Sequence, residues 1–580
     1  MRRKVVASLK SGAEGFVARA NCDHGYRERD LFSFIGNPRV TPKGISIIVL
    51  ICIFICLGTL AAGAQLAVQG QGRIVKLGAV VNFKELARRE PATPLKSKRK
   101  VIPFLRGPGA RPLPAGVALP PTAQPQHQEA APSGTALLPS PSVVAGFAAL
   151  GDNDSVIPPD TQGAVGPGNL MVTLNSQVAI QDRAGTASST VSLNSFWSSL
   201  SGVSGVFDPR LAYDPYDNRW IFVAASNADS TASKLLVGVS QSSDPSGTWN
   251  LYETTVDGTG TDWGDYPSMG FNKDWVVVDL NLFSISGGTF HEGQIYAFSK
   301  ADLYAGLVSV RVKVFTDANG FTVAPAATYD NTLATEYLIQ SWNGNSGGSG
   351  YLSISTITGA VGSEVYTAQV ALPSTANPWA GSPPGGNDFA PQEGSTHLIQ
   401  NGDDRIINAV YRNGYLWAAQ NAFLPAATPT RTAAQWWQFA ATGTVHQFGR
   451  VDDSTGTIFY AYPSIAVNAN NDAVLGYSSF SANQFASANY SIRLADDPAN
   501  TMRSETVLKA GEAVYYKIFS GSENRWGDYS NTIVDPSNDL DIWTIQEYAS
   551  SPNFINGDNR WGTWWGKIGL KKRRGQVISE

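Results

Sequence analysis

The sequence predicts an all-β protein, and three observations support that prediction. Only 16% of the 580 residues are Asp, Glu, Lys or Arg, against about 25% in ordinary soluble proteins, which argues against coiled coils and helical arrays. Glycine (57 residues) and aromatic residues (11%) are abundant. From residue 152 onward, short runs of Val, Ile, Tyr and Trp alternate with Gly, Asp, Asn and Pro, without a helical period.

A short motif recurs along this part of the chain. Each copy has a strand pattern, a turn rich in Asp, Asn, Gly or Pro, and a second strand pattern, which together predict a β-hairpin. In chain order the copies begin at Asp160, Phe207, Asp265, Arg405, Ala461 and Asp528. Their anchor residues, Gly166, Asp214, Asn272, Arg412, Asn468 and Asp535, are 48 to 67 residues apart, except for one interval of 140 residues. That interval leaves room for one more unit, near Tyr337 to Ile357.

Repeats of about 50 residues, each a small antiparallel sheet, are typical of propeller blades. The sequence therefore predicts a six- or seven-bladed β-propeller over residues 151–570. We expect it to follow a disordered Pro- and Ala-rich linker over residues 65–150, because residues 91–145 hold 12 of the 33 prolines. A basic tail, residues 571–580, ends the chain.

The N-terminal segment, residues 1–64, contains the apolar run Ile45 to Leu57 and ends in the small residues Ala62-Gly63-Ala64. These features predict a secretory signal with an unusually long basic region and cleavage after Ala64. The alternative is a retained membrane anchor helix over residues 45–64, which is just long enough to span a bilayer. Either interpretation places the propeller outside the cytoplasm, secreted or at the cell surface.

Charge and cysteine usage exclude several classes of function. Before residue 145 there are 20 basic and 7 acidic residues, and after it 23 basic and 40 acidic. Such an acidic body is a poor partner for nucleic acid. All three cysteines, Cys22, Cys52 and Cys56, precede the body, and the five histidines are scattered. We therefore expect no disulfide, zinc site or thiol nucleophile in the propeller, and no cofactor.

The motif Trp-Gly-Asp-Tyr occurs twice, each time directly before a predicted inner strand. In a propeller these positions lie at the channel mouth, where aromatic rings stack on sugars and carboxylates bind hydroxyl groups. With the arginines at blade starts, the candidate ligand-binding residues are Arg210, Trp263, Asp265, Tyr266, Arg525, Trp526, Asp528 and Tyr529. The alternative is structural: the Trp packs between blades and the Asp caps the turn. Repetition at equivalent blade positions favours this structural alternative.

Ser240 to Trp249 (SQSSDPSGTW) and Ala495 to Met502 (ADDPANTM) resemble the Asp-box, S-x-D-x-G-x-T-W. Together with Pro158 to Gly166 and Arg525 to Tyr529, they resemble uncharacterised secreted bacterial proteins of the sialidase-like (BNR/Asp-box) propeller superfamily. The resemblance implies the fold and the compartment. Sialidase chemistry would further imply three arginines, a Tyr nucleophile with a Glu partner, and an Asp acid/base. The catalytic candidates are Asp265, Asp528, Tyr529 and Glu547, but no third Arg is evident, so the activity is not transferred.

Acidic turns offer a metal hypothesis. Asp535, Asp539 and Asp541 supply oxygen ligands of the kind that calcium prefers. No EF-hand spacing is present, so hydrogen-bonded Asx-turns are the favoured interpretation and structural calcium is the alternative.

These observations predict an extracellular, monomeric, non-enzymatic binding or surface module for a glycan or protein ligand. Contact with a membrane is expected only through the N-terminal segment. The alternative is a sialidase-like glycan hydrolase acting in the propeller channel.

Overall fold

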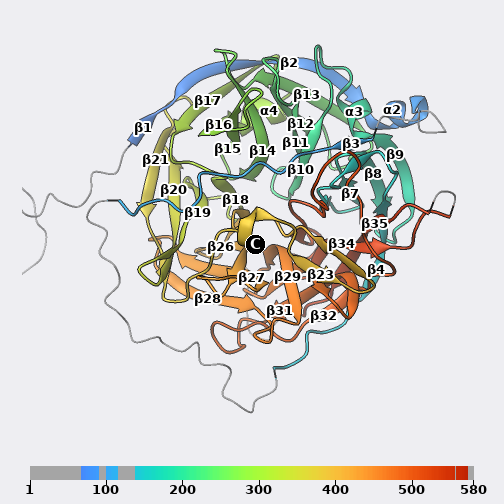
Figure 1. Cartoon of the computed structure of the whole chain (residues 1–580). Coiled ribbons are helices and arrows are strands. Elements are labelled where there is room, and N and C mark those ends of the chain that lie inside the picture. Colours follow the sequence, from blue (N-terminus) through green and yellow to red (C-terminus); the bar gives the residue numbers. More distant parts are fainter. Residues whose placement is uncertain (1–66, 91–98, 115–136, 555–556, 572–580) are drawn as a thin grey trace, which may run out of the picture. The chain divides into compact units, whose positions relative to one another are not determined.

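The computed structural model describes residues 67–90, 99–114, 137–554 and 557–571, whose regular structure is almost entirely β-strand (Figure 1). The expected signal or anchor segment, residues 1–64, and the tail beyond residue 571 lie outside the described residues. Within the described ranges, no helix combines the length and apolar character needed to cross a bilayer.

The described strands build seven antiparallel units of four strands, which we number as blades along the chain. Blade 1 consists of β6 Gln162–Val165, β7 Asn169–Thr173, β8 Gln177–Asp182 and β9 Ala187–Ser192. Blade 2 consists of β10 Phe207–Asp214, β11 Arg219–Ser226, β12 Lys234–Ser240 and β13 Thr248–Thr255. Blade 3 consists of β14 Asp262–Phe271, β15 Trp275–Ser284, β16 Phe290–Ser299 and β17 Ser309–Asp317. Each blade has four strands joined in chain order by hairpins. The recurring sequence motif is the first hairpin of a blade.

Blades 4 to 6 have the same arrangement of four strands. Blade 4 consists of β18 Ala324–Thr328, β19 Glu336–Ser346, β20 Ser349–Thr358 and β21 Val365–Ala371, and blade 5 of β25 Ile406–Arg412, β26 Tyr415–Leu424, β27 Arg431–Ala440 and β28 Val445–Val451. Blade 6 consists of β29 Ile458–Val467, β30 Ala473–Ser481, β31 Gln484–Arg493 and β32 Thr506–Lys509. Blade 4 fills the long interval between sequence motifs. The hairpin expected near Tyr337 to Ile357 is β19 and β20, paired antiparallel.

Blade 7 combines a strand that precedes blade 1 with the last three strands of the chain that the structure describes. Its first three strands are β33 Asn531–Val534, β34 Ile542–Ser550 and β35 Arg560–Ile568, and its outer strand is β4 Ala145–Gly151. The inner strands of all seven blades contact one another in a closed ring: β6, β10, β14, β18, β25, β29 and β33. The described residues therefore form a seven-bladed β-propeller in which an N-terminal strand closes the ring.

The sequence predicts a disordered linker over residues 65–150, but the part of this interval that the structure describes adds strands to the propeller. The first half of β2 (Gln71–Asn82) pairs with β17 and its second half with β13, so that it becomes a fifth strand of two blades. The short β1 (Ala67–Gln69) pairs with β21. Blades 2 to 5 are joined into one continuous sheet by β1, β2 and the parallel pairs β14–β18 and β18–β25. Burial alternates along β2, with Val75 and Val81 buried and Ile74 and Val80 exposed, as in an outer strand with one buried face. The prolines that predict a linker lie in residues 91–145, beyond β2.

Short elements complete the description. The helices are α2 Phe83–Arg89, α3 Leu193–Trp197, α4 Lys300–Tyr304 and the 3-10 turn η1 Pro384–Gly386. Two small ladders, β3 Lys100–Val101 with β5 Val156–Ile157 and β23 Ala390–Gln392 with β24 Ser395–Ile399, lie outside the blades, and β22 Ser374–Thr375 extends blade 4. Both Asp-box-like turns connect the third and fourth strands of a blade, β12 to β13 and β31 to β32.

Candidate functional site

The inner strands of several blades begin with the same backbone irregularity. A β-bulge interrupts the pairing in the amino-terminal half of β10, β14 and β29. Residues with φ between 51° and 57° occupy this position in five blades: Asp160, Asp208, Tyr266, Thr322 and Tyr462. Bulges redirect side chains, and strained backbone persists only where the surrounding contacts hold it. Polar side chains consequently gather at the amino-terminal ends of the inner strands.

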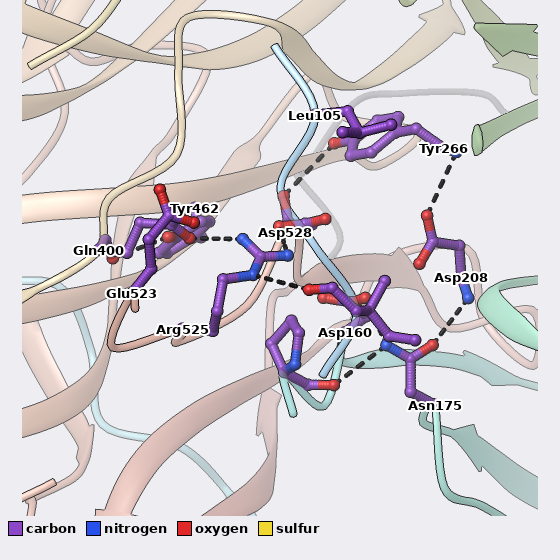
Figure 2. A network of polar contacts seen from close by, with 12 residues as sticks. Leu105, Asp160, Asn175, Asp208, Tyr266, Gln400, Tyr462, Glu523, Arg525 and Asp528 are labelled. Carbon is purple, nitrogen blue, oxygen red and sulfur yellow. Dashed lines mark hydrogen bonds and ion pairs between the residues drawn. The ribbon is translucent and has the colours of Figure 1, made fainter. Parts of the chain in front are cut away.

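Three aspartates from blades 1, 2 and 7 form a buried group, which we call the carboxylate cluster (Asp160, Asp208, Asp528). One oxygen from each lies within 4.8 Å of the other two. Asn175 links two of them, because its Nδ2 donates to Asp160 Oδ2 at 2.6 Å and its Oδ1 accepts from the Asp208 amide at 2.7 Å (Figure 2). The Tyr266 amide donates to Asp208 Oδ2 at 3.2 Å. The cluster is therefore positioned by neutral donors.

Burial raises the pKa of Asp160 and Asp208 in the cluster, and of Asp265 beside it. The pKa of Asp208 is raised to about 8 and that of the neighbouring Asp265 to about 7, first by burial and then by the adjacent carboxylates. Burial, with the charges of Asp528 and Asp208, holds the pKa of Asp160 well above its usual range. Without a compensating cation, the cluster keeps protons near neutral pH, because like charges in a buried site cannot all ionise.

Two arginines flank the cluster and are fully engaged. Nη2 of Arg525 lies 2.8 Å from Asp528 Oδ1, and its Nε donates to the Ile102 carbonyl at 3.2 Å. Arg405 forms a bidentate pair with Asp403, with N···O distances of 2.7 and 2.8 Å. Arg405 supplies the third arginine that the sequence did not make evident. Because each guanidinium already has a carboxylate partner, neither is free to bind a substrate carboxylate in this arrangement.

Arg210 lies between two tyrosine rings. Its guanidinium carbon is 3.4 Å from the ring centroid of Tyr529 and 4.9 Å from that of Tyr266, and the two rings meet edge to face at 5.8 Å. Burial raises the pKa of Tyr266 to about 12 and that of Tyr529 well above the usual value. Both phenols therefore remain protonated, and a protonated phenol is a weak nucleophile.

Residues 99–106, which we call the strap, cross the centre of the ring over the carboxylate cluster (Figure 1, blue). The strap begins in the β3–β5 ladder. The ring of Phe104 is surrounded by three guanidinium groups, with its centroid 4.7 Å from Arg405, 5.1 Å from Arg525 and 5.3 Å from Arg106. Nη2 of Arg405 also donates to the Leu105 carbonyl at 2.8 Å. The strap thereby closes the cluster off from solvent.

A small cavity of about 70 Å³ occupies the channel between the inner strands. Every inner strand contributes to its lining, largely through small side chains such as Ala164, Ala212, Ala327, Ala409 and Ala466. Its polar lining residues are Gln162, Arg210, Ser268, Asn408, Asn531 and Thr532. Of the described residues that line the cavity, Arg210 is the only charged one. Arg210 Nη2 and Ser268 Oγ are buried without a hydrogen-bond partner among the described residues.

The structure separates the predicted ligand-binding residues into two groups. Arg210, Asp265, Tyr266, Arg525, Asp528 and Tyr529 lie close to one another near the channel axis. Trp263 packs against Phe207 and Phe283, and Trp526 against Phe480 and Tyr515. Both tryptophans are at most 4% exposed, so neither ring is available to stack on a sugar. The structural alternative describes these two residues.

The catalytic candidate Glu547 lies on β34 and is buried. Burial, followed by the charges of Asp160 and Asp152, raises its pKa well above the usual range. It hydrogen-bonds neither candidate tyrosine among the described residues. The Tyr–Glu partnership that sialidase chemistry would imply is therefore absent from the described site.

The acidic turn of blade 7 does not assemble a calcium ligand set. Asp535 pairs with Arg183 and accepts from Trp543 Nε1 at 3.0 Å, whereas Asp539 pairs with Arg412. Asp541 lies 2.8 Å from the ammonium group of Lys567 and accepts hydrogen bonds from its own turn. Cations of the protein thus neutralise carboxylates that calcium would need. Within the described residues, the metal-ligating types converge at the carboxylate cluster instead.

Sequence reasoning did not select Asp160, Asp208, Asn175 or Phe104 as site residues. A signal was present for the first two: each stands at the start of a repeated motif, as Asp265 and Asp528 do. Aligning the motif starts would have placed all four carboxylates at one end of the channel. Asn175 and Phe104 belong to no motif.

Comparisons with known proteins concern the fold. No family model matches the sequence, and no curated protein matches it. Similar solved structures include a Synechocystis apocarotenoid oxygenase (11% identity, 60% of this chain and 74% of that chain, TM-score 0.36) and a Hadza microbial sialidase (10%, 69% and 73%, 0.34). A Trypanosoma rangeli sialidase is similar at 10% identity, over 69% of this chain and 59% of that chain, with a TM-score of 0.33. At these identities the likeness to sialidase-like propellers is one of fold alone.

Proposed function

We propose that this chain is an extracellular binding module without catalytic activity, and that a polar substituent of a glycan ligand enters its channel cavity. The observation that supports this proposal is the lining of the cavity, which presents amides, hydroxyls and one arginine but no carboxylate. Amide and hydroxyl groups bind sugar hydroxyls. A cavity of about 70 Å³ has room for a few water molecules or a polar substituent, but not for a whole sugar ring.

The hydrolase alternative has less support. Glycoside hydrolysis by a carboxylate pair needs the two groups on either side of the scissile bond, about 5 to 10 Å apart. The cluster carboxylates approach one another within 4.8 Å, and the strap covers them. A sugar ring does not fit between groups at that separation. The tyrosines beside them are protonated, which removes the nucleophile of the sialidase scheme.

Binding is tested with the full chain on a glycan array, followed by calorimetry on any hit. Ala409→Leu adds bulk at the cavity wall and should weaken binding at least tenfold, whereas Ala232→Leu, at an exposed loop position, should leave it unchanged. Thermal unfolding of both variants establishes that they are folded. Binding that survives Ala409→Leu would place the ligand elsewhere.

Catalysis is tested in parallel by incubating the chain with the same glycans and measuring released reducing ends. The proposal expects none. Release that is abolished by Asp528→Asn but retained by Asp539→Asn would favour the hydrolase.

Secretion belongs to the same proposal and rests on the apolar run at residues 45–57. Fractionation of expressing cells should recover the propeller outside the cytoplasm. Loss of this distribution on replacing Ile48 and Leu50 with Asp would support the N-terminal segment as the export determinant.

A further inference from the structure

We propose that the carboxylate cluster is a binding site for one Ca²⁺ ion, held on the propeller axis beneath the strap. The three ligands are Asp160, Asp208 and Asp528, which come from the first, second and last blades. This site is distinct from the acidic turn of blade 7 and does not depend on whether a glycan binds in the channel.

In Asp160 and Asp208, one carboxylate oxygen accepts a hydrogen bond and the other does not, whereas Asp528 Oδ1 lies beside Arg525. Oδ2 of Asp160 is held by Asn175, and Oδ2 of Asp208 is held by the Tyr266 amide. Oδ1 of each residue has no hydrogen-bond partner, although Asp160 is fully buried and Asp208 is 1% exposed. Buried acceptors without partners are costly. Donors that orient one oxygen and leave the other available are the usual surroundings of metal-binding carboxylates.

The spacing of the cluster oxygens suits a calcium ion. Calcium–oxygen distances are about 2.3 to 2.6 Å, so two oxygens on opposite sides of the ion lie about 4.6 to 5.2 Å apart. The cluster oxygens all lie within 4.8 Å of one another. Magnesium, with distances of about 2.0 to 2.1 Å, needs a tighter set and retains waters. Zinc prefers His and Cys ligands, and the propeller holds no cysteine.

The carboxylates around the cluster outnumber the cations that face them. Asp160, Asp208, Asp265 and Asp528 face Arg525, Arg210 and Lys100, while Arg405 is committed to Asp403. Ionised, the four acids carry one negative charge more than these cations. A calcium ion would offset that excess with every carboxylate ionised. Because the three ligands belong to the first two blades and the last, the ion would also fasten the point at which the ring closes.

The test uses the full chain, unfolded in chelator and refolded with Ca²⁺, with Mg²⁺ or with chelator alone. We expect one calcium per chain by elemental analysis after dialysis, and a thermal unfolding midpoint several degrees higher with Ca²⁺ than with Mg²⁺ or chelator. Asp160→Asn and Asp208→Asn should each abolish both effects. An amide oxygen can still accept the bonds from Asn175 and Tyr266, so these variants retain the local structure, and their unfolding midpoints in chelator verify folding.

Asp539→Asn is the matched control, since it removes a carboxylate of the acidic turn and should retain calcium. The proposal is overturned if the wild-type chain refolds to the same stability and metal content with and without Ca²⁺. In that case protons shared among the carboxylates balance the cluster. It is likewise overturned if Asp539→Asn loses the ion while Asp160→Asn keeps it, or if Mg²⁺ stabilises the chain as strongly as Ca²⁺.

Discussion

The guanidinium carbon of Arg405 lies 4.7 Å from the ring centroid of Phe104, across the amino-terminal end of the channel. Two further guanidinium groups contact the same ring, those of Arg525 and Arg106. One aromatic side chain of the strap thus contacts cations from two blades and from its own segment. Desolvated cation–π contacts contribute up to about 2 kcal/mol each, so Phe104 is the principal attachment of the strap.

Phe104→Ala should lower the free energy of unfolding by about 2 to 4 kcal/mol, through lost burial and lost contacts with the guanidinium groups. Hydrogen exchange should accelerate at the amides of residues 525–529, which the strap covers. Phe104→Leu keeps apolar volume but has no π face. Its free energy of unfolding and its exchange rates should therefore lie between those of the wild-type chain and Phe104→Ala. Equal exchange rates in the wild-type chain and Phe104→Ala would show that the strap does not protect the cluster.

The blade plan was accessible from the sequence because each first hairpin repeats a local pattern of strand, turn and strand. The motif of blade 4 is too divergent to align, and the length of the gap between its neighbours located this blade. The closing strand β4 was missed because its sequence, AGFAALG, has small residues whose strand character comes from pairing with β35. Strand identity there is imposed by tertiary contact.

The candidate site was accessible only in part for the same reason. The motif starts selected Asp265, Asp528 and their tyrosines, since position within a blade is a local property. The partners of these residues are set by the ring, which places Arg405 and Asp208 beside them from other blades. The sequence could assign Trp263 and Trp526 either to a ligand site or to the core, and their burial in the structure places them in the core.

Closure of the ring depends on tight packing between blades 1 and 7. A Cβ atom at Gly163, on β6, would lie 2.6 Å from the buried indole of Trp565, on β35. Gly163→Ala should therefore lower the free energy of unfolding by about 1 to 3 kcal/mol, the range for overpacked cores. Gly168→Ala is the control, because its Cβ would meet nothing within 4 Å, and it should change stability by no more than about 0.5 kcal/mol. Denaturant titration of both variants decides; similar stabilities would mean that Trp565 can shift at little cost.

A buried ion pair connects blades 2 and 3. The ammonium group of Lys300 lies 2.8 Å from a carboxylate oxygen of Asp214, and both side chains are at most 5% exposed. Lys300→Met leaves the Asp214 charge buried, with Tyr304 as its remaining side-chain donor, and should cost about 3 to 5 kcal/mol.

Adding Asp214→Asn to Lys300→Met removes the stranded charge and should recover part of that loss. Lys273→Met serves as the comparison, since its partner Asp274 is partly exposed and such pairs contribute about 0 to 1 kcal/mol. A double variant no more stable than Lys300→Met would exclude a buried charge as the cause.

Asp404 predicts a pH dependence of stability outside the carboxylate cluster. Burial, and then the charge of Asp403, raises its pKa to about 6, although Ser341 and Trp379 each donate to Oδ2 at 2.7 Å. The folded state therefore holds this proton more tightly than the unfolded state does. Its contribution to stability is complete below the unfolded pKa, near 4, and is lost as the pH rises through about 6.

Between pH 4 and pH 7 this loss should approach about 2 kcal/mol, at a slope of up to ~1.4 kcal/mol per pH unit for one proton. Asp404→Asn cannot ionise, so its stability relative to the wild-type chain should increase by that amount over the same interval. Ser341→Ala removes a donor to the charged form and should shift the transition to higher pH. Chemical denaturation at several pH values measures each curve. Parallel curves for the wild-type chain and Asp404→Asn would mean that Asp404 ionises in the folded state as readily as in the unfolded chain.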